Sequence, residues 1–313
     1  MEIISRIIIM ALLIGVGIVC RKTGIISNEI NKGISDIALK VATPALLVAS
    51  FQQELNMERL HRLGYASLLA VMAIVFAVIL GYICLPKGKK QTGDDNGKLA
   101  IERFSAIYSN CAFMGIPLIN GLYGEEGVFF LTAFYALFNV AVWTHGLVMI
   151  KGEAGVKQTL KALTSPALIG IAVGAALFFL QINLPEVIKQ TLDYTGSMTT
   201  PLGMLVAGVT IAQTNLLGAL KKLKVYYISA LRLIVIPVLT ILLFLPFPFD
   251  ETVMGVTVAA AACPAATICT MFAISFNKDS LYAGEIFAVS TVLSAGTLPL
   301  VMWIFDLLNV LVR

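Results

Sequence analysis

The sequence predicts an all-α polytopic membrane protein, with ten transmembrane helices in two inverted five-helix repeats. Composition, the length of the apolar runs and similarity between the two halves predict this fold. Of the 313 residues, 58% are apolar and 13% are charged, and the mean hydropathy is +0.91. Soluble domains have about 45–50% apolar and about 25% charged residues, so an ordinary cytoplasmic enzyme is not expected. The net charge of +4 is small and dispersed, which argues against a nucleic-acid partner.

The apolar residues fall in runs of about 20, the length of a helix that crosses about 30 Å of hydrocarbon. Helices are required because every backbone polar group in lipid must be satisfied within its own segment. The lipid bilayer is therefore an expected partner. The ten expected spans are residues 3–20, 33–52, 63–85, 101–121, 126–150, 165–183, 187–212, 225–246, 252–276 and 283–310.

Several spans have features of their own. The first has the length of a signal peptide, but nine further runs follow it, so we interpret it as a helix. Spans 2 and 7 contain the pairs Thr43-Pro44 and Thr200-Pro201. The short segments 124–127 and 247–251, which follow spans 4 and 8, carry acids and no base.

Lysine and arginine are unevenly distributed between the two sets of loops. Fifteen of them lie at the loops after spans 1, 3, 5, 7 and 9, and five lie on the other face. By the positive-inside rule the odd-numbered loops are cytoplasmic, and both termini of this multi-pass protein lie outside the cytoplasmic membrane.

The two halves resemble each other. An offset of 157 residues superposes Thr43-Pro44 on Thr200-Pro201 and Gly17 on Gly174, and an offset of 160 superposes Trp143 on Trp303. Each half has five spans, an odd number, so the second copy enters the membrane from the opposite side. We expect a first repeat at residues 1–150, a cytoplasmic connector at 151–164 and a second repeat at 165–313. Inverted repeats are typical of secondary transporters, with a site between the repeats near the bilayer midplane.

Spans 4 and 9 are interrupted by glycine and proline. Residues 109–117 read SNCAFMGIP, and residues 259–267 read AAAACPAAT. A proline inside a helix removes a hydrogen bond and costs about 3 kcal/mol unless the freed groups find partners. Irregular backbone is tolerated in a bilayer only where it is buried or lines a cavity, and small residues allow close approach. We expect the two broken helices to cross; the alternative is two proline kinks in packed helices.

A broken helix exposes N–H groups at the start of its second half, with about half a positive charge from the helix dipole. Two such ends form a site for a small anion. Asn110 adds an amide donor at the break, although its side chain could instead cap the freed backbone. Thr43-Pro44 and Thr200-Pro201 could form the opposite wall of the site or only kink their helices.

Ionisable groups within the spans are few. Asp36 and Lys40 have the spacing of an ion pair on one helix, whereas Arg232 and His145 could steer an anion, carry a coupling proton or anchor the helix ends. Spans 4, 5, 9 and 10 have no paired carboxylates at mid-depth, and span 5 offers neutral Asn139 instead. This favours an anion or a neutral solute over a cation as substrate. The five cysteines have no metal-binding or disulfide spacing, and we expect no metal or cofactor.

These motifs resemble the auxin efflux carrier family, which includes plant PIN proteins and bacterial carriers of small organic acids. The resemblance covers essentially the whole chain. It is carried by Asn110 with 114–118, by 121–124, by 263–265 and by 297–299. The family implies ten helices in inverted repeats, of the sodium/proton antiporter and bile-acid symporter type, with helices 4 and 9 crossing at Pro117 and Pro264 and Asn110 contacting the substrate. It also implies a scaffold of helices 1, 2, 6 and 7 and a transport domain of helices 3–5 and 8–10.

The chain departs from the plant pattern in having Ser109 before the asparagine and a short connector. These departures suggest a prokaryotic organic-acid carrier. The residues expected to bind substrate are Asn110, Cys111, Met114, Gly115, Pro117, Cys263, Pro264, Ala265, Thr43, Pro44, Thr200 and Asn139. The candidates for coupling or steering are Asp36, Lys40, His145 and Arg232.

We therefore expect a secondary transporter of a small mono- or dicarboxylate, such as malate or malonate, that works by elevator-type alternating access. The alternatives are an anion channel and a uniporter for auxin-like aromatic carboxylates. An enzyme is not expected, because no nucleophile has an evident base. Sodium coupling, proton coupling and a homodimeric state stay open.

Overall fold

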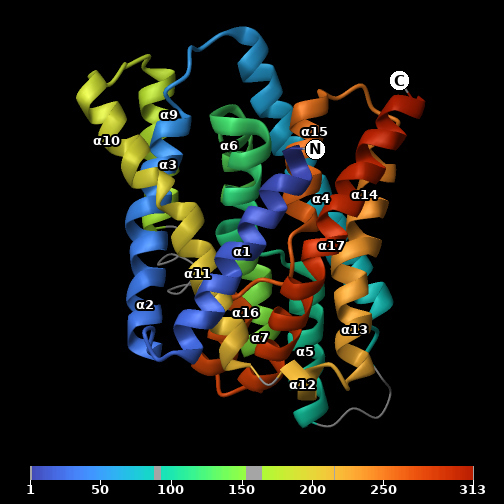
Figure 1. The fold of residues 1–313 in the computed structure, drawn as a ribbon. Coiled ribbons are helices and arrows are strands. Elements are labelled where there is room, and N and C mark those ends of the chain that lie inside the picture. Colours follow the sequence, from blue (N-terminus) through green and yellow to red (C-terminus); the bar gives the residue numbers. More distant parts are fainter. Residues whose placement is uncertain (1, 88–92, 153–163, 215, 313) are drawn as a thin grey trace.

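The computed structural model describes residues 2–87, 93–152, 164–214 and 216–312, and within these ranges the protein is helical (Figure 1). The one β-type pairing among these residues is an isolated antiparallel bridge between Ser109 and Ala265. Both ends of the chain lie toward the same end of the helical bundle (Figure 1). Most of the expected connector, residues 153–163, lies outside the described residues.

The described residues of the first half form ten helical segments, of which those named η are π-helical. They are α1 (Glu2–Lys22), α2 (Asn28–Ile37), η1 (Ala38–Ala42), α3 (Thr43–Ser50), α4 (Met57–Cys84), α5 (Gly93–Ile107), η2 (Cys111–Gly115), α6 (Ile116–Ala141), η3 (Val142–Gly146) and α7 (Leu147–Lys151). Helix α6 contains a sharp kink, because Gly124 has φ 62° and ψ −157°, a conformation that glycine adopts easily. The kink separates the end of the expected fourth span from the start of the fifth.

The described segments of the second half follow a similar order. They are α9 (Pro166–Phe179), α10 (Glu186–Ser197), α11 (Thr199–Gln213), α12 (Leu216–Ala219), α13 (Leu223–Ala230), η4 (Leu231–Val235), α14 (Ile236–Phe244), α15 (Glu251–Ala262), α16 (Ile268–Ser275) and α17 (Ser280–Val312). The expected seventh span is thus α10 with α11, and the expected ninth is α15 with α16. Side-chain caps fix some helix starts: Asp250 accepts a hydrogen bond from the Val253 N–H at 3.0 Å.

Of the four π-helical segments in the described ranges, three end two residues before a proline: η1 before Pro44, η2 before Pro117 and η4 before Pro237. Proline has no N–H and its ring clashes with the carbonyl four residues back, so the preceding turn widens to hydrogen bonds over five residues. The candidate residues Lys40, His145 and Arg232 lie in π-helical segments, and Asn110 immediately precedes one.

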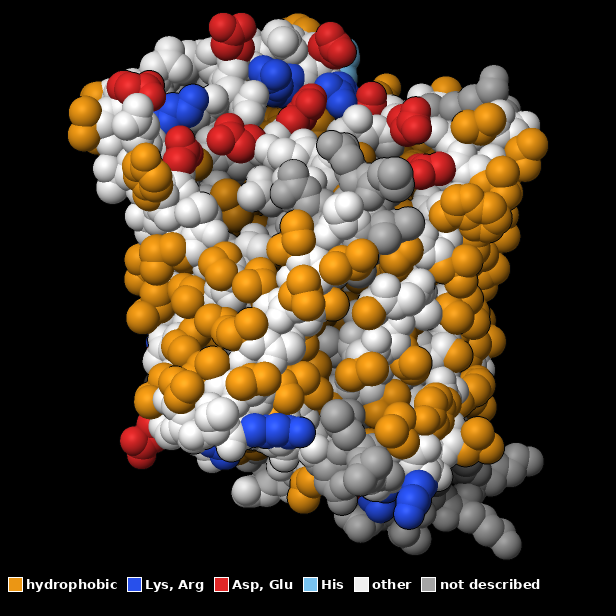
Figure 2. All heavy atoms as spheres, viewed as in Figure 1, with side chains coloured by type: hydrophobic (Ala, Val, Ile, Leu, Met, Phe, Trp, Pro, Cys, Tyr) orange, Lys and Arg blue, Asp and Glu red, His pale blue; other side chains and the backbone are white. Residues whose placement is uncertain are grey.

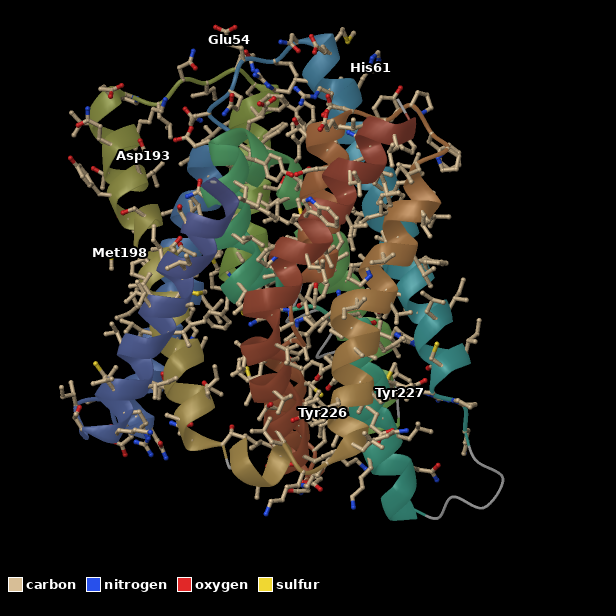
Figure 3. All side chains as sticks on the ribbon, turned by 45° about the vertical axis from the view of Figure 1, so that its right-hand side comes forward. Glu54, His61, Asp193, Met198, Tyr226 and Tyr227 are labelled. Carbon is tan, nitrogen blue, oxygen red and sulfur yellow. The ribbon has the colours of Figure 1, made fainter. Side chains whose placement is uncertain are left out.

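Among the residues that the structure describes, five helical stretches are long and apolar enough to cross a membrane: Asn28–Ser50, Met57–Cys84, Cys111–Lys151, Leu223–Phe244 and Ser280–Leu311. Two shorter apolar helices, Pro166–Phe179 and Glu251–Ala262, accompany them. Figure 2 shows hydrophobic side chains across the middle of the visible face, with charged side chains gathered at its two ends. Figure 3 places Glu54 and His61 at one of these ends and Tyr226 and Tyr227 toward the other. This distribution is that of a polytopic membrane protein.

Helices of the two halves pack closely on each other. A side chain at Gly17 of α1 would collide with the Leu205 carbonyl of α11, and one at Gly208 of α11 would collide with the Ile14 carbonyl of α1. Helix α9 packs against α3 in the same way, where a Cβ on Gly170 would lie 3.0 Å from Pro44 Cα. Small residues at these positions let the helix backbones touch, which is how membrane helices associate without a hydrophobic driving force.

Candidate functional site

Two interrupted helices meet in the interior of the bundle. Helix α5 ends at Ile107 and η2 begins at Cys111, while α15 ends at Ala262 and α16 begins at Ile268. The two intervening stretches run antiparallel, so that Asn110 N donates to the Pro264 carbonyl at 2.7 Å and Ala266 N donates to the Tyr108 carbonyl at 3.0 Å. Each break therefore satisfies backbone groups that the other break frees, as buried backbone requires.

The crossing in the first half lies at Ser109 and not at Pro117, which corrects the expectation from the family resemblance. Pro264 lies in its break, but Pro117 is in the first turn of α6, after η2. The physical reason is that a helix can break without a proline where the other interrupted segment supplies hydrogen-bond partners to the freed backbone groups. The backbone continues helically from η2 into α6, so Pro117 widens the preceding turn and does not interrupt the helix there.

Arg232 lies against the C-terminal ends of both interrupted helices. Its guanidinium donates to the carbonyls of Ala106 (3.2 Å) and Ile107 (2.7 Å) at the end of α5, and to the Cys263 carbonyl (3.1 Å) after α15. The residue is 2% exposed. Helix C-termini carry partial negative charge, so these contacts compensate the buried positive charge.

The N-terminal ends of the segments that follow the two breaks, η2 and α16, have no side chain that caps them. The Asn110 side chain makes no capping hydrogen bond to η2, and Thr267 makes none to α16. Asn110 is 3% exposed and its Nδ2 has no hydrogen-bond partner among the described residues. The capping role considered for Asn110 is therefore wrong. A buried donor without a partner is rare and marks a place where a ligand acceptor would fit.

A cavity of about 280 Å³ opens beside these ends. Its polar lining residues are Lys40, Ser109, Asn110, Asn139, Ser165 and Thr267. Its apolar lining residues are Leu39, Ala112, Phe113, Tyr135, Phe138, Val142, Trp143, Pro166, Ala167, Ala266, Ile268 and Met271. Ser165 Oγ is a second buried polar atom without a partner. The cavity thus combines an apolar, aromatic wall with a few unsatisfied polar groups and no carboxylate.

The structure separates the predicted site residues into two groups. Asn110, Asn139 and Lys40 line the cavity. The others lie outside its lining, packed in the crossing or between helices: Cys111, Met114, Gly115, Pro117, Cys263, Pro264, Ala265, Thr43, Pro44 and Thr200. Gly115 is an example of packing, since a Cβ there would lie 3.4 Å from Cys263 Sγ.

Sequence reasoning missed the aromatic wall. Tyr135, Phe138, Val142 and Trp143 line the cavity beside Asn139, which was predicted. Their spacing of three and four residues places them on one face of a helix, and this was the available signal. Ser165 and Thr267 come from segments distant from α6 in the sequence, so the pattern on α6 could not indicate them.

The remaining ionisable candidates make local contacts. Lys40 Nζ lies 2.8 Å from Asp36 Oδ1, which confirms the expected ion pair, and both side chains are exposed. His145 lies between two tyrosines, with Nδ1 2.8 Å from Tyr108 Oη and Nε2 3.2 Å from Tyr82 Oη. His145 is outside the cavity lining.

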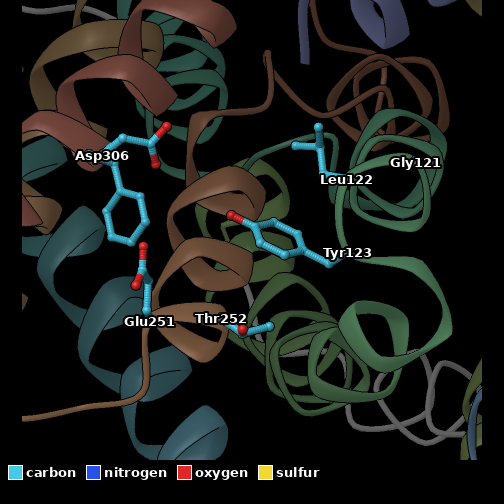
Figure 4. Close-up of a pocket in the computed structure, with 7 residues that line it drawn as sticks. Gly121, Leu122, Tyr123, Glu251, Thr252 and Asp306 are labelled. Carbon is cyan, nitrogen blue, oxygen red and sulfur yellow. The ribbon is translucent and has the colours of Figure 1, made fainter. Parts of the chain in front are cut away.

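A second cavity of about 260 Å³ has the opposite character. It is lined by Gly121, Leu122, Tyr123, Glu251, Thr252, Phe305 and Asp306 (Figure 4). Two carboxylates in its wall would repel an organic anion, so it is not the site expected for one. Among the described residues, no group of three His, Cys, Asp or Glu side chains could hold a metal ion.

A helical membrane protein with two interrupted helices and a half-polar cavity beside them belongs to the class of membrane transporters. The comparison with known families agrees: the membrane transport protein family matches residues 2–159 and 153–302. The chain therefore belongs to this family, the auxin efflux carriers, which are transporters and not enzymes. It is 25% identical over 303 residues to an uncharacterised transporter of Methanothermobacter thermautotrophicus, with 96% of each chain covered. It is 24% identical over 315 residues to one of Methanocaldococcus jannaschii, covering 97% of this chain and 98% of the other.

Proposed function

We propose that the protein is a secondary transporter that moves a small organic anion across the cytoplasmic membrane by alternating access. The observation that carries the proposal is the unpartnered Asn110 Nδ2, buried beside a cavity without carboxylates. Two helix N-termini border the same cavity, and each provides about half a positive charge. Together they suit a single carboxylate.

The cavity favours a monocarboxylate with an apolar body over malate or malonate. Phe113, Tyr135, Phe138 and Trp143 form much of its wall. A second carboxylate would need a second positively charged partner in a wall made largely of these rings, and burying an unpaired charge is costly. Lys40 is the one cation in the lining, and it already pairs with Asp36. The volume is near the lower end of the usual range for ligand pockets, about 300–1,000 Å³, which suits a small molecule.

Reciprocal packing supports ten spans in inverted repeats. Gly17 contacts Gly208 across α1 and α11. The 157-residue offset superposes Gly17 on Gly174 and Phe51 on Gly208. A Cβ on Gly174 would lie 2.6 Å from the Phe51 ring, so this second pair is also in contact. A pseudo-twofold axis between repeats requires contacts to recur in this way.

Ion pairs support a division into two bodies, with helices 1, 2, 6 and 7 as scaffold. Arg62 of α4 pairs with Glu126 of α6 at 2.7 Å and with Asp250, the N-cap of α15, at 3.0 Å. At the other end, Lys222 pairs with Glu285 at 2.6 Å and Lys224 with Glu102 at 3.4 Å. These four pairs all join residues in or next to the expected spans 3–5 and 8–10, which are the helices of the proposed transport domain. The Lys40–Asp36 pair stays within the expected second span, so no ion pair between described residues joins the two bodies.

The contact between the proposed bodies is apolar and close. Ala38 of η1 and Val206 of α11 form a small cluster with Phe113 of η2. A Cβ on Gly203 of α11 would lie 3.0 Å from the Phe113 carbonyl. A smooth apolar surface permits sliding without breaking ion pairs, which supports an elevator-type movement of the body that carries the crossing. From the positive-inside rule we also propose that both termini lie outside the cytoplasm.

Transport by the purified protein in proteoliposomes tests the proposal. We expect saturable uptake and counterflow of phenylacetate, with malonate at least about tenfold slower because of its second charge. Asn110→Ala should lower phenylacetate uptake about tenfold or more by removing a donor to a charged acceptor. Asn120→Ala, a control in the same span but outside the cavity lining, should behave as wild type. Equal uptake by the wild type and Asn110→Ala would contradict the site, and non-saturating conductance without counterflow would indicate a channel.

A further inference from the structure

We infer that Arg232 is a built-in cation that occupies the place of a coupling metal ion at the crossing and makes the crossing selective for anions. This inference rests on the proposed carboxylate transport. It assigns Arg232 the role of a positioning residue, because the side chain is 2% exposed and does not line the 280 Å³ cavity.

The first argument is the set of groups that Arg232 binds. Its three acceptors are backbone carbonyls at the C-terminal ends of α5 and α15, one helix from each half. Carbonyls of unwound helices and C-terminal ends of half-helices are the groups with which transporters of this general type bind Na⁺. Here the same groups are occupied by a guanidinium that belongs to the chain.

The second argument is the balance of charge. Four helix ends meet at the crossing: two C-termini with about −0.5 charge each and two N-termini with about +0.5 each. Without a cation these charges cancel. Arg232 adds one positive charge beside the two C-termini, and among the described residues no carboxylate forms an ion pair with it. The N-termini next to Asn110 are then left to attract an anion.

The third argument is the location of Arg232 in the chain. It lies in η4, whose widened turn precedes Pro237. The helix that carries it contacts both α5 and α15. A residue anchored on a third helix holds both breaks at once, so that the antiparallel pairing of Ser109 and Ala265 and the position of Asn110 depend on it. The consequence is a carrier that binds its anion without Na⁺.

Thermal unfolding of purified variants tests the built-in cation independently of any substrate. We expect the wild type to have the same Tm in NaCl and in choline chloride. Arg232→Ala should lower the Tm by about 5–10 °C, because three buried carbonyls lose their donor. Millimolar guanidinium or Na⁺, but not choline, should restore part of this loss. Arg232→Lys keeps the charge but not the fork of donors, so its Tm should lie between those of the wild type and Arg232→Ala.

Arg103→Ala is the matched control, since Arg103 also donates to a helix-end carbonyl, that of Leu85 at 2.8 Å, but away from the crossing. Its Tm should not respond to guanidinium. A Tm of Arg232→Ala equal to wild type in all salts, or a wild-type Tm that rises with Na⁺, would overturn the inference.

Phenylacetate uptake then separates this inference from the proposed function. If the inference and the proposed function both hold, wild-type uptake is equal with Na⁺ or choline outside. Uptake by Arg232→Ala should then be at least about tenfold lower, and guanidinium should restore part of the loss. Sodium-dependent wild-type uptake would contradict the built-in cation alone. Absence of carboxylate uptake in the wild type, with the Tm results as expected, would contradict the proposed function alone.

Discussion

Ser109 and Ala265 lie opposite each other in the antiparallel bridge at the crossing, and they are 156 residues apart in the sequence. This separation is within one residue of the offset that superposes Thr43-Pro44 on Thr200-Pro201. Equivalent positions of two copies meet only at a symmetry axis. The bridge therefore lies where a pseudo-twofold axis between inverted repeats would pass. By the separation of the bridge, Asn110 would correspond to Ala266, which has no polar side chain. The unpartnered amide at the break therefore lies in the first half alone.

This asymmetry gives a prediction for Asn110. Asn110→Asp replaces an amide donor by a group that is acceptor-only when ionised and repels a carboxylate. We expect it to reduce phenylacetate uptake more than Asn110→Ala does, by at least about a further tenfold. Ala266→Asn places a second amide at the corresponding position and should not reduce uptake in this way. Uptake by Asn110→Asp above that of Asn110→Ala would show that Asn110 does not face the anion.

The contact between α1 and α11 predicts a large effect on stability. A Cβ at Gly208 would collide with the Ile14 carbonyl, so Gly208→Ala forces the two backbones apart. Overpacking of this kind costs about 1–3 kcal/mol, and we expect a fall in Tm of several degrees. The control is Gly15→Ala, which lies on α1, the other helix of this contact, and has no atom within 4 Å of the added Cβ. If both variants melt alike, the close approach of α1 and α11 is wrong.

The apolar contact at Phe113 predicts a variant that binds but does not transport. A Cβ at Gly203 would lie 3.0 Å from the Phe113 carbonyl, so Gly203→Val obstructs movement between the proposed bodies. We expect phenylacetate uptake to fall at least about tenfold with a nearly unchanged equilibrium Kd, because Gly203 is outside the cavity lining. Gly33→Val, on the exposed side of α2 with open space around it, should transport normally. Parallel loss of binding and uptake would argue against the sliding contact.

Lys40 at the cavity lining predicts an effect of ionic strength. Its pair with Asp36 is solvent-exposed, and such pairs contribute about 0–1 kcal/mol, so Lys40→Gln should leave the Tm nearly unchanged. We expect slower phenylacetate uptake at low salt and wild-type uptake at high salt, where attraction of the anion is screened. Asp36→Asn breaks the same pair but keeps the cation, so it should not slow uptake. A loss in Lys40→Gln that persists at high salt would indicate direct contact with the substrate.

Much of the site was predictable from local sequence. The breaks in residues 101–121 and 252–276 follow from glycine, proline and small residues in otherwise apolar runs, and Asn110 was identified because it is a polar group at a break. The Asp36–Lys40 pair follows from helical spacing alone. The assignment of the crossing to Pro117 was wrong, since proline is only one of several ways to interrupt a helix. The hydrogen bonds that form the crossing, from Asn110 N to the Pro264 carbonyl and from Ala266 N to the Tyr108 carbonyl, join segments far apart in the sequence.

The sequence by itself determined that this is a helical membrane protein of the auxin efflux carrier family, because span length, charge distribution and motifs are local properties that lipid and helix geometry constrain directly. The tertiary structure alone decided which groups meet. It placed Arg232 on two helix C-termini, left Asn110 without a partner and joined a face of α6 to Ser165 and Thr267 in one cavity. These relationships depend on how helices pack across the two halves, and packing between residues more than a hundred positions apart has no signature in local pattern or composition.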